Sequence, residues 1–374
     1  MMCNVPAVNG RACALLACAL LACSGLALAL VAPAAAAPAT TSFDLTGAVD
    51  RPGTYGLADL QAFPPVTESV TYGTGSGPVS ATFTGASLYT LLSTAGLQAP
   101  PGAKNGTLRD VVVATGSDGY AVAFSEGELD PRFGGKTAAP NLVAYQVNGA
   151  PLGADGFARI TAPGDSLGGR YVSNLASLNV VQAPNNPAQG GGQSTSFTLS
   201  GLVSHPATYN EASLAALPSV TENVTYTAGG SPVSASFTGV SLWTLLTEAG
   251  LVTDPAIKND ELRDYVLATG SDGYEATFSL GELDPSFGGS ATAPDLVAYD
   301  ENGQPLGADG FARLVVPGDA AGGRYVSNLV SLQVLDATAA APVPEPGSFA
   351  LLLARLVGLA ARRRQRVATN APAP

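Results

Sequence analysis

The stretch VVVATGSDGYAVAF at residues 111–124 decides the fold, and it recurs as YVLATGSDGYEATF at residues 265–278. In each copy, two runs rich in apolar residues flank a Ser-Asp-Gly sequence. Such runs around an Asp-Gly pair predict two short antiparallel strands joined by a tight turn. We expect the aspartate side chain to accept a hydrogen bond within the turn and the glycine to adopt a positive φ.

This hairpin belongs to a much longer repeat. Residues 43–181 and 197–335 align without a gap at a constant offset of 154, and more than half of the aligned positions are identical. The period is too long for a solenoid, whose repeats run roughly 20–50 residues, and each copy has the size of an ordinary domain. The sequence therefore predicts two modules, 40–181 and 197–336, each folding on its own. Residues 182–196, rich in Gly, Pro, Asn and Gln, are expected to form a flexible linker.

Strand patterns dominate within each module. Apolar and polar residues alternate at 42–49 and 66–72, and a second hairpin is predicted at 141–152, with Asn148-Gly149 in its turn. One helix is expected at 87–96, where Ser87 can cap the N-terminus and Gly96 can end the helix. These elements predict an α+β module rich in strands.

Residues 1–39 have the layout of a secretory signal peptide. A single arginine precedes a long apolar run that ends in small residues, with cleavage expected near residues 36–39. A retained N-terminal anchor is the alternative. All four cysteines lie in this segment, so the mature chain would have no disulfide and no thiolate ligand for a metal. Export without disulfides favours a location in a bacterial envelope or outside the cell.

A second targeting pattern occupies residues 342–366. Pro344, Glu345 and Pro346 precede a 15-residue, mainly apolar run with Arg355 in its middle, and Arg362, Arg363 and Arg364 follow it. As a helix the run would span about 22 Å, less than the roughly 30 Å of a bilayer core, which makes it a marginal membrane stop. The arrangement resembles the PEP-CTERM sorting signal. That resemblance implies transient anchoring in the inner membrane and removal of the tail by an exosortase.

Charge and composition exclude several functions. The formal net charge is −12, and the chain contains one histidine, His205. An acidic surface repels phosphate backbones, so nucleic-acid binding is not expected. One histidine without a cysteine partner gives neither a catalytic triad nor a zinc site.

Both modules resemble, almost end to end, the molybdopterin-binding domain of sulfite oxidase-like oxidoreductases. The resemblance rests on FTGASLYTLLSTAGL at 83–97, the Ser-Asp-Gly-Tyr hairpin, and FARITAPGDSLGGRYVSNLASLNV at 157–180. It implies an α+β, β-rich sulfite oxidase-like fold, duplicated in tandem. It also implies weak anion-site candidates, and these are Arg159, Arg170, Arg313 and Arg324. Ion pairs with nearby aspartates are the alternative for the same residues, through Asp155, Asp165, Asp309 and Asp319.

The modules depart from the family where the metal ligand belongs. In the family a strand ends at a cysteine that ligates molybdenum, but these strands end in Tyr72-Gly73-Thr74 and Tyr226-Thr227-Ala228. We therefore expect no catalytic residue, no metal ligand and no cofactor, with molybdopterin as the alternative.

The sequence as a whole favours an exported cell-envelope protein, sorted by an exosortase, whose two modules are non-catalytic and serve binding or structure. One alternative is a molybdopterin-dependent oxidoreductase of the sulfite oxidase type. Another is an extracellular matrix protein that binds envelope polysaccharide. Whether the protein is an enzyme stays open, although the missing cysteine argues against it.

Overall fold

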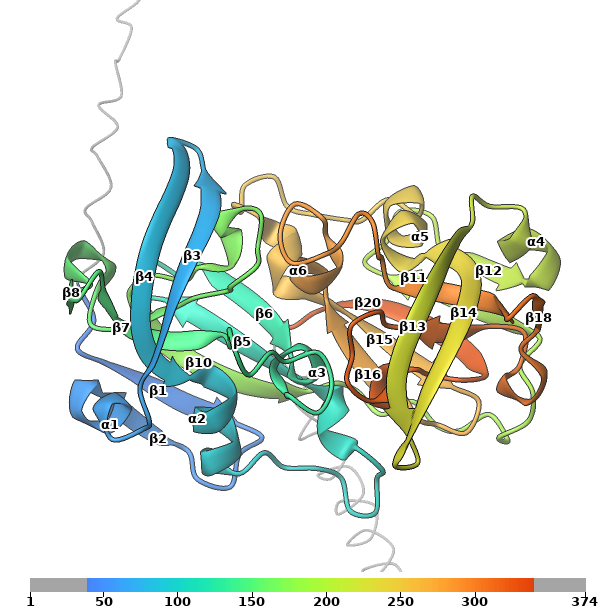
Figure 1. The fold of residues 1–374 in the computed structure, drawn as a ribbon, viewed down its shortest axis with the longest axis horizontal. Helices are drawn as coiled ribbons and strands as arrows, with labels where there is room; N and C mark the ends of the chain where they lie inside the picture. The colour runs from blue at the N-terminus through green and yellow to red at the C-terminus, as the bar shows by residue number, and fades with distance from the viewer. Residues whose placement is uncertain (1–38, 340–374) are drawn as a thin grey trace, which may run out of the picture. The chain divides into compact units, whose positions relative to one another are not determined.

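The computed structural model describes residues 39–339 (Figure 1). The predicted signal peptide, up to residue 38, lies outside the described residues. The predicted sorting signal at 342–366 also lies outside them, including Pro344, Glu345, Pro346 and Arg362–Arg364. Within the described part of the chain, no helix is long and apolar enough to cross a membrane.

The first repeat folds into two five-stranded sheets. One has the order β2-β1-β10-β5-β6, and the other has the order β3-β4-β7-β8 with β9 beside β7. The strands are β1 (Ser42–Gly47), β2 (Gly53–Gly56), β3 (Val66–Thr74), β4 (Gly77–Ser87), β5 (Asp110–Gly116), β6 (Ala121–Ser125), β7 (Leu142–Val147), β8 (Ala150–Pro151), β9 (Arg159–Ile160) and β10 (Leu175–Gln182). The helices are α1 (Leu57–Gln61), α2 (Leu88–Ala95) and α3 (Glu126–Leu129), with short 3-10 turns at Gly106–Arg109, Gly153–Asp155 and Gly168–Arg170.

The second repeat has the same arrangement, with sheets β12-β11-β20-β15-β16 and β13-β14-β17-β18, and β19 beside β17 (Figure 1). Its strands are β11 (Ser196–Gly201), β12 (Ala207–Asn210), β13 (Val220–Ala228), β14 (Ser231–Ser241), β15 (Asp264–Gly270), β16 (Glu275–Ser279), β17 (Leu296–Glu301), β18 (Gln304–Pro305), β19 (Arg313–Val315) and β20 (Leu329–Asp336). The helices are α4 (Glu211–Ala215), α5 (Leu242–Glu248) and α6 (Leu280–Leu283), with 3-10 turns at Asp260–Arg263, Gly307–Asp309 and Gly322–Arg324.

In both repeats the first and last long strands lie side by side and run parallel. Leu45 of β1 is opposite Leu178 of β10, and Leu199 of β11 is opposite Leu332 of β20. The other strand pairs are antiparallel. In each of these sheets, strands from the two ends of the same repeat are therefore hydrogen-bonded neighbours.

The predicted turn chemistry is confirmed in both hairpins. Asp118 Oδ1 accepts a hydrogen bond from the Tyr120 backbone N–H at 3.0 Å, and Gly119 has φ +85°. In the second copy, Asp272 accepts the bond from Tyr274 at 2.9 Å. The side-chain bond and the left-handed glycine fix the turn locally, as expected for Asp-Gly.

The predicted helix and second hairpin are also confirmed. Ser87 Oγ accepts a hydrogen bond from Thr90 N at 3.3 Å at the start of α2, and Gly96 ends the helix with φ +83°. Asn148 and Gly149 both have positive φ between β7 and β8. Local sequence therefore determines these elements.

Residues 182–196 were expected to form a flexible linker, but several of them are hydrogen-bonded to the second repeat. The Asn186 N–H donates to Glu275 Oε1 at 2.7 Å, and the Gln189 N–H donates to the Ser271 carbonyl at 2.7 Å. Ser271 Oγ in turn donates to the Gly192 carbonyl. The polar linker residues therefore cover the second Ser-Asp-Gly turn.

The two hydrophobic cores exchange residues. Leu108 and Phe133 of the first repeat are buried in the core of the second, and Leu262 and Phe287 of the second are buried in the core of the first. A third buried cluster, between β5–β6 and β15, contains residues of both repeats. The repeats consequently form one body rather than two separate domains.

Candidate functional site between the two repeats

Arg159 and Arg313 are each held within their own repeat. Arg159 pairs with Asp155 at 2.5 Å, and Arg313 pairs with Asp309. The Arg159 guanidinium also lies over the Phe83 ring, 5.3 Å from its centroid. In each pair the aspartate lies four residues before the arginine. The observed contacts of Arg159 and Arg313 are therefore the ion pairs with nearby aspartates that the sequence offered as the alternative to anion binding.

Arg170 and Arg324 are almost fully buried, and each contacts two carboxylates. Arg170 donates two hydrogen bonds to Asp165, both at 2.8 Å, and a third to Glu128 at 2.5 Å. Arg324 has the same arrangement with Asp319 and Glu282. Burial by itself lowers the pKa of Arg170, but the carboxylates of Glu128 and Asp165 outweigh burial and raise it. Both guanidinium charges are therefore compensated within the protein, and anion binding at these arginines stays a prediction.

Both arginines pass close to the backbone of the other repeat. A Cβ added at Gly281 would lie 2.4 Å from the Arg170 Cδ, and one at Gly127 would lie 2.3 Å from the Arg324 Cδ. A side chain at either glycine would collide with an arginine that its carboxylates hold in place. Gly281 therefore leaves the space that the Arg170 side chain occupies, and Gly127 leaves the space for Arg324.

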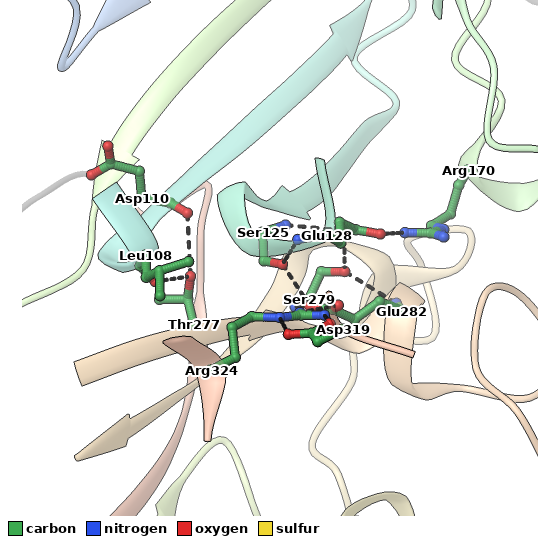
Figure 2. Close-up of polar contacts among 10 residues, drawn as sticks. All are labelled: Leu108, Asp110, Ser125, Glu128, Arg170, Thr277, Ser279, Glu282, Asp319 and Arg324. Atoms are coloured by element: carbon green, nitrogen blue, oxygen red, sulfur yellow. Dashed lines mark hydrogen bonds and ion pairs between the residues drawn. The ribbon is translucent and has the colours of Figure 1, made fainter. Parts of the chain in front are cut away.

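Reciprocal hydrogen bonds join α3 to α6. Ser125 and Glu128 form a capping box at the start of α3, and Ser279 and Glu282 form the same box at α6. The Ser125 hydroxyl also donates to Glu282 Oε1 at 2.6 Å, and the Ser279 hydroxyl donates to Glu128 Oε1 at 2.7 Å (Figure 2). Burial raises the pKa of Glu128 to about 7, although Arg170 opposes the rise. The serine and glutamate of each capping box therefore also form hydrogen bonds between the two repeats.

Further contacts break the symmetry between the repeats. Thr277 Oγ1 donates to the Leu108 carbonyl at 3.0 Å and to the Asp110 carbonyl at 3.2 Å (Figure 2). Arg109 pairs with Glu275 at 2.8 Å. The first repeat has Ala123 and Ala121 at the positions equivalent to Thr277 and Glu275, so it cannot make these bonds.

The tyrosine of each duplicated turn also bridges the repeats. Tyr120 donates its hydroxyl to the Gly169 carbonyl at 2.6 Å and accepts a bond from Asn259 Nδ2 at 2.9 Å. Tyr274 makes the equivalent bonds, with Gly323 and Asn105. The duplicated turn therefore positions a tyrosine that fixes the arginine loop of its own repeat against the other repeat.

A cavity of about 250 Å³ lies where these elements meet. Both repeats line it, and the ionisable lining residues include Glu128, Lys136, Asp165, Arg170, Glu282, Asp295, Asp319 and Arg324. Trp243, the single tryptophan of the chain, also lines it. Sequence reasoning did not identify Trp243, Lys136 or Asp295, because only the fold brings these positions together.

The strand ends that replace the family cysteine are filled by aromatic packing. Tyr72 stacks on Tyr171 with ring centroids 4.0 Å apart, and Tyr226 stacks on Tyr325 at 4.3 Å. Residues 39–339 contain no cysteine and no group of three or more His, Asp or Glu side chains placed to hold a metal. The described residues therefore do not fit a metal held by a protein thiolate.

A buried carboxyl near this position was also missed from the sequence. Glu68 is 7% exposed, and Thr161 Oγ1 donates to its Oε1 at 2.9 Å. Its Oε2 has no hydrogen-bond partner among the described residues, and burial raises the pKa of Glu68 to about 7. The signal was available, because Glu68 alternates in phase with the inward-facing Val70 and Tyr72.

Comparison with known proteins supplies a family for one part of the chain. Residues 186–343 match the family model of the oxidoreductase molybdopterin binding domain. No curated protein matches the sequence. Among solved structures, the sulfane dehydrogenase SoxCD from Paracoccus pantotrophus has 13% sequence identity and a TM-score of 0.32, covering 70% of this chain and 76% of that chain.

The family match corrects the expectation that the protein has no cofactor. A molybdopterin-binding domain over residues 186–343 points to a molybdopterin cofactor. The expectation was wrong because it gave one missing ligand more weight than the rest of the domain, which matches the family model without that ligand. The β-rich, sulfite oxidase-like domain expected from the sequence is confirmed for that part of the chain.

Proposed function

We propose that this chain is an oxidoreductase-type protein that binds a molybdopterin cofactor through its second repeat, with the first repeat completing the same body. The family match over residues 186–343 carries the proposal. That range includes Arg313 and Arg324, the two second-repeat arginines that the resemblance identifies as anion-site candidates. The exchanged core residues support a single functional unit of both repeats.

The missing thiolate limits what this chain can contribute. The described residues supply no cysteine, so the proposal concerns the organic part of the cofactor and assigns no metal ligand. When bound, a molybdopterin centre supplies oxidation–reduction chemistry. The role of this chain would be to bind and orient the group and to exclude water from it.

The test is the pterin and molybdenum content of the full chain. The protein would be purified from a bacterial host that synthesises molybdopterin, alongside a molybdopterin enzyme made in the same cells as a loading control. We expect one pterin per chain, measured by fluorescence after oxidation, with molybdenum measured separately by elemental mass spectrometry. A loaded control enzyme beside a chain that lacks pterin would contradict the proposal.

A non-catalytic binding or structural module is the second candidate. The observation that favours it is the pairing of Arg170 and Arg324 with two carboxylates each, which leaves neither charge free for an anion. Stoichiometric pterin would exclude this candidate as the sole function. Pterin-free protein that binds an envelope polysaccharide would support it.

We also propose export and exosortase sorting to the cell envelope. The order of the signal peptide, Pro344-Glu345-Pro346, the apolar run and Arg362–Arg364 supports this. Intact-mass measurement in a host with an exosortase should give a new C-terminus near residues 344–346, and a strain without the exosortase should keep the tail. Full-length protein in the inner membrane of both strains would contradict sorting.

A further inference from the structure

The cavity between the repeats contains a carboxylate without a partner. Asp295 lines it, and within residues 39–339 no hydrogen bond or ion pair reaches the Asp295 side chain. Burial raises the pKa of Asp295 well above its ordinary value, and Arg324 only partly opposes the rise. Asp295 is half-buried, and a partly desolvated carboxylate without a partner is stabilised when a counter-charge or hydrogen-bond donor reaches it.

The cavity has an excess of acidic side chains. Arg170 and Arg324 are each shared between two carboxylates, so neither is available to Asp295 as an ion-pair partner. Lys136 is the third basic residue of the lining, but it is exposed and makes no ion pair with a described carboxylate. In total, five carboxylates and three basic groups line the cavity. A bound cation would favour the charged form of these carboxyl groups, whereas an anion such as a phosphate would oppose it.

An aromatic ring lies in the same lining. Trp243 is partly buried on α5, where the first repeat has Tyr89. Tryptophan is the side chain whose ring face attracts organic cations most strongly. A carboxylate and an indole in one cavity are together suited to an ammonium group that also has some apolar surface.

We propose that this cavity binds a small primary amine, with its ammonium group held between Asp295 and Trp243. The volume of about 250 Å³ is below the roughly 300–1,000 Å³ of typical ligand pockets, which indicates a small molecule. Metal ions are a poorer match, because no group of metal-ligating side chains is formed among the described residues. This site goes beyond the proposed cofactor function and does not depend on it.

The test is calorimetric titration of the mature chain with matched probes. D-glucosamine and n-butylamine carry the ammonium group, whereas D-glucose and 1-butanol are their neutral counterparts. We expect both amines to bind at least tenfold more tightly than their counterparts at pH 7. Equal binding of glucose and glucosamine would overturn the amine proposal in favour of a neutral saccharide, and failure of both amines to bind would also overturn it.

The repeat supplies substitutions that its fold already accommodates. Asp295→Asn installs the residue of position 141 and should weaken amine binding at least tenfold, while Trp243→Tyr installs the residue of position 89 and should weaken it several-fold. Lys136→Ser installs the residue of position 290 and should strengthen binding, because it removes a competing cation.

Glu248→Thr is the control, since it removes one exposed negative charge away from the cavity and matches Thr94 of the first repeat. It should leave amine binding unchanged. Wild-type affinity in Asp295→Asn, or an equal loss in Glu248→Thr, would overturn the proposal. Thermal unfolding of each variant verifies its fold. Lys136→Ser complements the other variants, because it should strengthen amine binding where they weaken it.

Discussion

The Ser125 hydroxyl donates a 2.6 Å hydrogen bond to Glu282, a residue 157 positions later in the chain. Ser279 returns the bond to Glu128 at 2.7 Å. Each serine also caps its own helix. Each glutamate also accepts a hydrogen bond from an arginine of its own repeat. Helix ends, arginine loops and the contact between repeats therefore depend on the same four side chains.

Ser125→Ala should destabilise the protein more than removal of an ordinary helix cap. We expect a loss of about 2–4 kcal/mol, since a cap contributes about 1 kcal/mol and a hydrogen bond to a charged group about 1.5–3 kcal/mol. Ser87→Ala, which removes the cap of α2 only, is the control and should cost about 1 kcal/mol. Chemical denaturation measures both, and equal losses would show that the bond to Glu282 contributes nothing.

The exchanged cores make the repeats interdependent. Phe133→Ala should cost about 3–5 kcal/mol, because the ring is buried in the core of the second repeat. Residues 194–338 expressed alone lack both Phe133 and Leu108, so we expect them to unfold without cooperativity, in contrast to the independent folding predicted from the sequence. Adding residues 40–184 should restore a cooperative transition in a calorimeter. Two separate, cooperative halves with unchanged melting temperatures would refute this.

Gly281→Ala should be destabilising although it adds only a methyl group. The new Cβ would lie 2.4 Å from the Arg170 Cδ, and Asp165 and Glu128 hold that guanidinium in place. We expect a loss of about 1–3 kcal/mol in denaturant unfolding, as for overpacked interiors. Gly53→Ala is the control, because a Cβ there meets no atom within 4 Å. If both variants are equally stable, Arg170 is not fixed.

Stability should fall as the pH rises from about 4.5 to 7, partly because of Glu68. Burial raises the pKa of Glu68 from 4.5 to about 7, so the folded state holds the proton more tightly than the unfolded state. Its stabilising contribution is complete below about pH 4.5 and is lost by about pH 7. Glu68→Gln should therefore be more stable than wild type at pH 8, by up to about 3 kcal/mol, and equally stable at pH 4.

Glu222→Gln is the matched control for Glu68, because Glu222 is the equivalent but less buried residue of the second repeat. Its gain at pH 8 should be smaller. Denaturant unfolding at several pH values compares the two variants. A pH profile of Glu68→Gln that parallels wild type would show that Glu68 titrates normally.

Sequence reasoning was reliable where a structure depends on neighbouring residues. The Asp118-Gly119 turn, the Asn148-Gly149 hairpin and the Ser87 cap each depend on a few adjacent residues, and all three are observed. Aspartate partners of the arginines were also foreseen as an alternative, because Asp165 and Asp319 lie five residues from Arg170 and Arg324.

Contacts between the repeats could not be predicted in the same way. A Ser-x-x-Glu pattern predicts the helix start at Ser125, but its local geometry does not specify a second bond to Glu282. The cavity likewise depends on the placement of Trp243 and Asp295 by different elements. The two similar repeat sequences gave no indication that their cores would exchange residues, since two copies of one hydrophobic pattern predict two separate cores.

The parallel pairing of β1 with β10, and of β11 with β20, has a mechanical consequence. Tension on the two ends of a repeat would draw its first and last strands along their axes in opposite directions. The interstrand hydrogen bonds would then carry the load together in shear instead of opening one after another. Forced extension is governed by the unfolding rate rather than by equilibrium stability. This topology therefore suits each repeat to resist tension applied between its two ends.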